Sequence, residues 1–260
     1  MSRTAYPEHI RAPADQILAP AFPPRLPWFN TKPLPMHQQR GRPVLIEFWD
    51  FCRPNSIRTL PYMEAWHERY SELGLRVIGV HSAGFEASES PEAVAEAVTR
   101  LGIKHPVVVD VGDQIWQAYD NPGWPTRYLF NGENRLFEYH FGEGGYEETE
   151  RAIQELLGTS REPLAPIRPE DATGAILEPQ TEDVEGFYSG PYEAGGVWGV
   201  FSGRGTARVN GRSLELTAPG AYELISHARH TRGVLELSVS TGLEVHAVCF
   251  TPGLAGPGVS

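Results

Sequence analysis

Long apolar runs, basic residues and cysteine are all scarce in this sequence. No stretch of eighteen or more apolar residues occurs, so no segment has the usual length of a membrane-spanning helix. The first fifteen residues lack the basic start and apolar core that mark a secretory signal peptide. We therefore expect a soluble, cytoplasmic protein that does not bind a membrane.

Acidic residues outnumber lysine and arginine by 33 to 22, and the formal net charge is −11. Proteins that bind the phosphate backbone need a basic face to release counterions, so we expect no nucleic-acid partner. The two cysteines, Cys52 and Cys249, can form neither a disulfide framework nor a four-cysteine zinc site. We expect no cofactor and no metal, and any thiol chemistry must be sparse.

Composition divides the chain into four segments. Residues 1–40 form a proline-rich arm, and exposure of both Trp28 and Phe29 would be unfavourable, so this arm should lie against the next domain as an irregular cover. Residues 41–158 alternate short apolar runs with helical periodicity, which predicts helices on both faces of a central sheet. Residues 159–175 are polar and rich in proline, as is typical of a linker.

Residues 176–255 contain short alternating strands punctuated by turn dipeptides, and they predict a small all-β domain of the sandwich or jelly-roll type. In the preceding domain, the expected strands are 44–49, 75–81, 107–110, 128–130 and 135–141. The expected helices are 57–73, 90–101, 114–119 and 147–157. Asn131-Gly132 predicts the tight turn of a hairpin between the last two strands.

The segment from Glu47 to Pro61 resembles the start of a thioredoxin domain: a strand ending in Phe48-Trp49, then a loop, then a helix that contains a proline. In thioredoxins the nucleophilic cysteine lies four residues after the tryptophan and eight before that proline. The resolving cysteine follows three residues later. Both counts reach Arg53 here, so Arg53 and Ser56 occupy the redox positions, and Cys52 lies one residue early.

Further features resemble the TlpA/DipZ-like thioredoxin proteins, a redoxin family of thiol-disulfide oxidoreductases. The matching segments are Asn55, Arg58 to Tyr62, Val77 to His81, Trp124-Pro125 and Phe141 to Tyr146. The resemblance implies a thioredoxin-like α/β fold and a cis proline at Pro125 that faces the loop. It also implies a groove whose candidate residues are Pro54, Asn55, Glu86, Trp124, Pro125 and Thr126.

Thiol-disulfide exchange needs a thiolate at the positive end of a helix and a second thiol that resolves the mixed disulfide. Arginine and serine supply neither, so the two-cysteine mechanism is closed. Cys52 leaves one alternative open, because a one-residue shift of the backbone could bring Cys52-Arg53-Pro54-Asn55 into the place of a reactive motif. The other interpretation is an ordinary loop cysteine.

Other candidates also have two interpretations. The resemblance places Glu47 where thioredoxins bury a proton-accepting acid, and burial should raise its pKa; it is either a working base or a structural relic. Trp124 either narrows access to the loop or packs in the core. Glu86 is either a second acid of the site or a solvated loop carboxylate, and Cys249 is expected to be buried in a strand.

The β-rich segment offers two weak signals. His227, His230 and His246 could gather around a metal, although surface histidines without a metal are the simpler interpretation. Four aromatic residues could stack on sugars or pack in the core: Phe187, Tyr188, Tyr192 and Trp198.

Three hypotheses follow. The first is a redox-inactive thioredoxin-like protein that binds a protein or small ligand. The second is a single-cysteine oxidoreductase or peroxidase that uses Cys52 with an external thiol as the resolver. The third is a carbohydrate or peptide receptor that binds through residues 176–255.

Overall fold

The structure is a computed structural model that describes residues 9–11 and 17–256. The chain divides into two compact units. The first comprises Met1–Asp50, Asn55–Ala83 and Val98–Ile167, and the second comprises Phe51–Pro54, Gly84–Ala97 and Arg168–Ser260. In the part of the chain that the structure describes, no helix is long and apolar enough to cross a bilayer.

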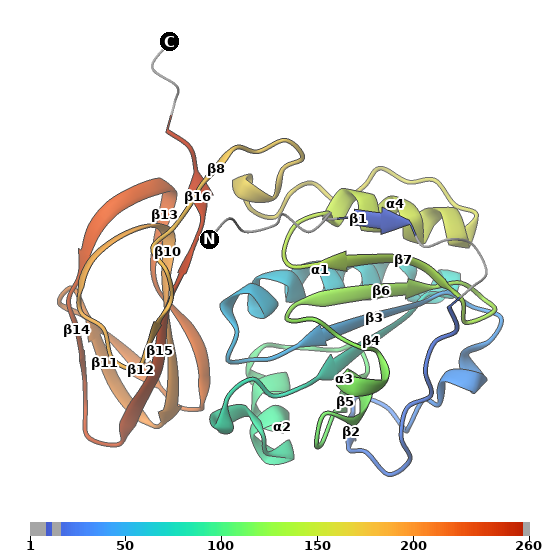
Figure 1. Cartoon of the computed structure of the whole chain (residues 1–260), viewed down its shortest axis with the longest axis horizontal. Coiled ribbons are helices and arrows are strands. Elements are labelled where there is room, and N and C mark those ends of the chain that lie inside the picture. Colours follow the sequence, from blue (N-terminus) through green and yellow to red (C-terminus); the bar gives the residue numbers. More distant parts are fainter. Residues whose placement is uncertain (1–8, 12–16, 257–260) are drawn as a thin grey trace. The chain divides into compact units, whose positions relative to one another are not determined.

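The first unit contains a seven-stranded mixed sheet in the order β1-β7-β6-β3-β4-β5-β2 (Figure 1). Its strands β3, β4 and β5 are parallel, and the other pairs are antiparallel. The strand bounds are β1 His9–Arg11, β2 Trp28–Phe29, β3 Val44–Trp49, β4 Arg76–His81, β5 Val107–Val109, β6 Thr126–Phe130 and β7 Leu136–Phe141. This is the expected thioredoxin-like sheet.

Apolar residues of β3 point to both faces, so all six residues of this central strand are buried. On one face, Leu45 packs with α1 (Pro54–Tyr70) and α4 (Tyr146–Leu157). On the other face, Val44, Ile46 and Phe48 share a core with Ile115 of α3 (Gln114–Ala118). The two layers of helix bury the sheet and hold the end of β3 beneath the start of α1.

The remaining helices are short or capped as the sequence predicts. Helix α2 spans Pro91–Arg100, and the hydroxyl of Ser90 accepts a hydrogen bond from the N–H of Ala93. The 3₁₀ helices are η1 Met36–Gln39, η2 Ser71–Leu73, η3 Glu86–Ser88 and η4 Pro169–Asp171. Pro61 lies inside α1, as expected.

The second unit contains three antiparallel sheets, in the orders β13-β10-β15-β9, β12-β11-β14 and β16-β8. The strand bounds are β8 Leu177–Glu178, β9 Val184–Glu185, β10 Gly190–Gly203, β11 Gly205–Val209, β12 Arg212–Leu216, β13 Gly220–Leu235, β14 Leu237–Val239, β15 Leu243–Thr251 and β16 Gly253–Leu254. Val197 and Phe201 of one sheet share a core with Val209 and Leu216 of another. Two sheets therefore pack face to face, as in the expected sandwich.

Three local expectations were wrong. Residues 28–29 of the arm are a strand at the edge of the sheet, where they pair with β5. The β6–β7 hairpin forms, but its loop extends to Arg135. In this loop Asn134 has a left-handed backbone, with φ of 61°. The side chain of Asn131 organises the loop, because it accepts hydrogen bonds from the N–H groups of Glu133 and Arg135. Strand β13 has 16 residues, although short strands were expected in residues 176–255.

The segment that follows α4 is attached to the first unit. Within the predicted linker 159–175, the N–H of Leu164 donates to Glu150 at 2.8 Å, and the N–H of Ile167 donates to the hydroxyl of Tyr62 at 2.8 Å. Along the chain, the boundary between the two units lies between Ile167 and Arg168. Buried partners on α1 and α4 therefore fix the first part of a segment that the composition presented as a linker.

Candidate functional site

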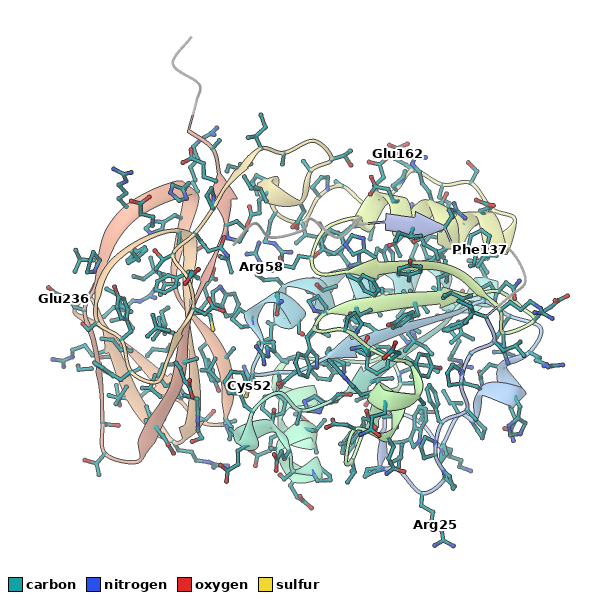
Figure 2. All side chains as sticks on the ribbon, in the orientation of Figure 1. Arg25, Cys52, Arg58, Phe137, Glu162 and Glu236 are labelled. Carbon is teal, nitrogen blue, oxygen red and sulfur yellow. The ribbon has the colours of Figure 1, made fainter. Side chains whose placement is uncertain are left out.

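Helix α1 begins at Pro54, directly after Arg53. Cys52 precedes the helix by two residues and is fully buried; Figure 2 labels its side chain. Ser56 lies in the first turn of the helix and is also fully buried. The helix thus starts and ends three residues earlier than the expected range 57–73, and Cys52 lies outside its amino end.

The hydroxyl of Ser56 ties the end of β3 to the start of α1. It accepts a hydrogen bond from the N–H of Asp50 at 3.3 Å. The N–H of Ser56 donates to the side-chain oxygen of Asn55 at 3.0 Å. A hydroxyl at this position therefore has a structural role, because it satisfies a buried backbone donor.

Asn55 connects the helix to the proline loop. Its amide nitrogen donates to the carbonyl of Trp124 at 2.8 Å. The Trp124–Pro125 peptide bond is cis, as expected from the resemblance. The N–H of Gly142 donates to the carbonyl of Pro125 at 2.8 Å, so the backbone acceptors on both sides of this peptide bond are occupied.

The Trp124 ring is held on two sides. Its indole N–H donates to the carbonyl of Ser82 at 2.9 Å, and its ring centroid lies 4.3 Å from that of Trp116. Thr126, the last predicted groove residue, is buried and donates its hydroxyl to the carbonyl of Gly123 at 2.8 Å. Trp124 is therefore held as a fixed wall, which agrees with the packing interpretation.

A small cavity opens beside this wall. It has a volume of about 160 Å³ and is lined by Pro122, Gly123, Trp124, Pro125, Thr126, Phe141 and Gly142. The lining is mainly apolar and aromatic. Its size suits one side chain rather than a drug-sized ligand, whose pockets usually exceed about 300 Å³.

Glu47 is fully buried on β3, and burial raises its pKa to about 8, although the positive charge of Arg127 opposes the shift. Arg127 lies opposite Glu47 in the β3–β6 pairing. Among the described residues, neither carboxylate oxygen of Glu47 has a hydrogen-bonding partner. The sequence predicted the burial and the raised pKa; it missed Arg127, which strand register alone identifies.

Trp49 packs tightly beneath the loop. Its ring meets the ring of His81 edge to face at 5.1 Å, and His81 lies 3.6 Å from the carboxylate of Asp50. A Cβ atom at Gly79 would lie 2.9 Å from the indole nitrogen of Trp49 and 3.0 Å from Nε2 of His105. Glycine is therefore required on the neighbouring strand for the tryptophan to fit.

The remaining candidate residues belong to the second unit. The guanidinium of Arg53 lies 4.9 Å above the Phe85 ring, a cation–π contact. Glu86 is exposed at the start of η3, in the environment of a solvated carboxylate. Cys249 is buried, as expected, and burial raises the pKa of its thiol to about 12.

The three histidines of the β-rich segment have separate partners. His227 bonds to the hydroxyl of Tyr192 at 2.8 Å and His246 to the hydroxyl of Ser202 at 2.7 Å, whereas His230 lies beside Glu178 and Glu193. His227 and His230 both belong to β13. No group of three metal-ligating side chains occurs within residues 9–11 and 17–256.

Of the four aromatic residues proposed to stack on sugars, Tyr192 and Trp198 are buried, and Tyr188 is partly buried. Only Phe187 among these four is exposed, at 54%. The packing alternative therefore describes most of this set.

The comparisons with known proteins cover about half of the chain. No family model matches. Over 163 residues the chain is 33% identical to Protein DipZ of Mycobacterium tuberculosis, an alignment that covers 59% of this chain and 24% of DipZ. The chain thus spans about a quarter of that protein's length. It is 28% identical over 126 residues to the thiol-disulfide oxidoreductase ResA of Bacillus anthracis, covering 48% of this chain and 69% of ResA.

Among solved structures, a thioredoxin-like superfamily protein matches with a TM-score of 0.51 and 25% identity. That match covers 56% of this chain and all of the other. The strand order, the cis peptide bond and these relatives agree with one another. The chain belongs to the thioredoxin-like superfamily, and this part of it is similar to thiol-disulfide oxidoreductases of the DipZ and ResA type.

Proposed function

We propose that this chain is a redox-inactive member of the thiol-disulfide oxidoreductase family that binds a protein partner. One observation supports the proposal most: α1 begins at Pro54, directly after Arg53, which agrees with the sequence counts that assign Arg53 and Ser56 to the two redox positions. Disulfide exchange needs a thiolate and a resolving thiol. The hydroxyl of Ser56, in addition, already accepts the N–H of Asp50.

The burial of Cys52 argues against the single-cysteine alternative. A nucleophilic thiol needs access to its substrate and a site that stabilises the thiolate, such as a helix amino end. Cys52 is fully buried and precedes the first residue of α1 by two positions. An ordinary packed cysteine fits this environment better than a peroxidatic one.

The cavity beside Trp124 is the proposed contact with the partner. Its apolar lining favours one aliphatic or aromatic side chain of the bound protein. The Trp124 carbonyl is occupied by Asn55, so backbone pairing at this position would require displacing an existing hydrogen bond. We therefore propose that side-chain burial supplies most of the affinity.

An insulin-reduction assay with dithiothreitol tests the redox part of the proposal. The wild-type chain and Cys52→Ser should not accelerate the reaction above the dithiothreitol background. The double variant Arg53→Cys/Ser56→Cys should gain activity by at least about tenfold, because it supplies a thiol at the helix start and a second one to resolve it. Full wild-type activity that survives Cys52→Ser would contradict both the inactive and the single-cysteine proposals.

Alkylation separates the redox-inactive proposal from the single-cysteine alternative. Iodoacetamide should modify Cys52 of the folded chain slowly between pH 6 and 8 and rapidly after unfolding in urea, because burial protects the thiol. Cys249→Ser, tested in the same way, leaves Cys52 as the single reporter. Rapid labelling of native Cys52 near neutral pH would instead favour the single-cysteine enzyme.

A further inference from the structure

The outer edge of β7 is covered by residues from the start of the chain. Strand β1 is the outermost strand of the seven-stranded sheet, and Arg11 lies directly opposite Glu138 of β7. The chain meets the same edge again where the N–H of Leu136 donates to the carbonyl of Ile17 at 2.8 Å. An extended segment therefore supplies partners to backbone groups that an open edge would expose.

The side chain of Arg11 enters a site formed by two acids and an aromatic ring. Its Nη2 atom lies 2.9 Å from Oε2 of Glu155, and its Nε atom lies 3.8 Å from Oε2 of Glu138. The guanidinium lies 4.4 Å from the centroid of the Phe137 ring. A planar cation that can bond carboxylates and stack on a ring at the same time matches arginine better than lysine.

The burial of Glu138 is a second observation that indicates a binding site at this edge. Only 1% of this residue is exposed, although carboxylates are rarely buried without a partner. Burial raises its pKa to about 7, and the leading opposing contribution comes from Arg11, followed by the hydroxyl of Thr149 and the charge of Arg127. The added strand thus brings a second cation to the buried carboxylate, beside Arg127 of β6.

We propose that the outer edge of β7 is a docking site for an extended segment of a protein partner that carries an arginine, and that β1 is the occupant supplied by the chain itself. Strand β1 has three residues, so a partner strand competes with a short internal one. The formal net charge of −11 favours the approach of a basic segment. This site is separate from the cavity at Trp124, and neither proposal depends on the other.

A fluorescent peptide with the sequence of residues 6–13, YPEHIRAP, tests this site on the full-length chain by anisotropy. Arg11→Ala should bind the peptide at least about tenfold more tightly than the wild-type chain, because the internal arginine no longer competes. A peptide with alanine in place of its arginine should bind Arg11→Ala at least about tenfold more weakly. Arg208→Ala, an exposed arginine on β11, is the matched control and should behave like the wild type.

Two further measurements locate the binding. In the Arg11→Ala background, Glu138→Gln should reduce the preference for the arginine peptide. Glu155→Gln should do so as well, and since Glu155 is exposed, this second variant keeps the test valid if the buried substitution impairs folding. Hydrogen exchange should show new protection in β7. Equal binding of the two peptides, equal affinity of wild type and Arg11→Ala, or protection elsewhere would each overturn the proposal.

Discussion

The two ends of helix α1 bury polar groups in opposite ways. At the carboxyl end, the hydroxyl of Tyr70 donates to Glu150 at 2.6 Å and accepts from Gln154 at 2.8 Å. Arg69 adds an ion pair to Glu150 at 3.1 Å. The buried carboxylate at this end is therefore surrounded by donors. Burial, together with the contact to Glu150, raises the pKa of Tyr70 to about 12, although Gln154 and Arg69 oppose the shift.

Beneath the amino end, Glu47 is equally buried, yet no hydrogen bond to either oxygen is found in the described chain. Nε and Nη1 of Arg127, the residue opposite, likewise have no such partner there. Hydrogen bonds thus stabilise the buried Glu150 at the carboxyl end of the helix. Beneath the amino end, burial without such bonds destabilises the charged form of Glu47. The difference agrees with our proposal that the amino end has kept a family acid after its thiols were replaced.

The largest effect that this comparison predicts is for Glu150→Ala. Removal of the carboxylate leaves Tyr70, Arg69 and the N–H of Leu164 without their acceptor, so the free energy of unfolding should fall by about 4 kcal/mol. Urea unfolding followed by tryptophan fluorescence measures it. Glu147→Ala is the matched control, because its i,i+4 pair with Arg151 is exposed and contributes little to stability. Similar losses of unfolding free energy for both variants would contradict the contrast between the two ends of the helix.

A smaller effect, with a defined pH dependence, is expected for Glu47→Gln. The pKa of Glu47 is raised from 4.5 to about 8 in the folded chain. The folded state therefore holds a proton that the unfolded state releases, and wild-type stability should decline as the pH rises from about 4.5 to 8. The variant should lack this decline, so its stability relative to the wild type should rise by about 3 kcal/mol between pH 4 and pH 7. The difference between unfolding free energies at pH 5 and pH 8 checks the sign; an unchanged pH profile would show that Glu47 is ionised when folded.

The smallest effect concerns the tie between α1 and the proline loop. Asn55→Ala removes the donor to the Trp124 carbonyl and the acceptor for the N–H of Ser56. The free energy of unfolding should fall by about 1 to 2 kcal/mol. Asn55→Asp keeps an acceptor but loses the amide donor, so it should retain part of this stability. If Asn55→Asp were as destabilised as Asn55→Ala, the Trp124 contact would account for the whole effect.

Much of the fold follows from signals that are local in the sequence. The continuous apolar run of β3 predicts its burial on both faces, and Ser90 with Pro91 predicts the start of α2. The resemblance supplied the cis bond before Pro125. The turn at Asn131-Gly132 was wrong in detail, because the Asn131 side chain organises a longer loop instead of a two-residue turn.

The candidate site was less predictable, since its contacts join distant parts of the chain. The counts from Trp49 and Pro61 predict that Arg53 and Ser56 hold the redox positions, but nothing local indicates that Asn55 bonds to Trp124. The pairing of Glu47 with Arg127 depends on the register between β3 and β6. Likewise, composition presented residues 159–175 as a linker. It could not show that Leu164 and Ile167 have acceptors on the helices α4 and α1.

The close approach of Trp49 to Gly79 also constrains how this sequence can diverge. Any side chain at position 79 would collide with the indole and with His105, so a larger residue there requires a smaller one at position 49 or 105. Positions 49, 79 and 105 should therefore change together or not at all across descendants of this chain. The loss of thiol chemistry that we propose would remove selection on two loop positions, but it would leave this steric coupling in force.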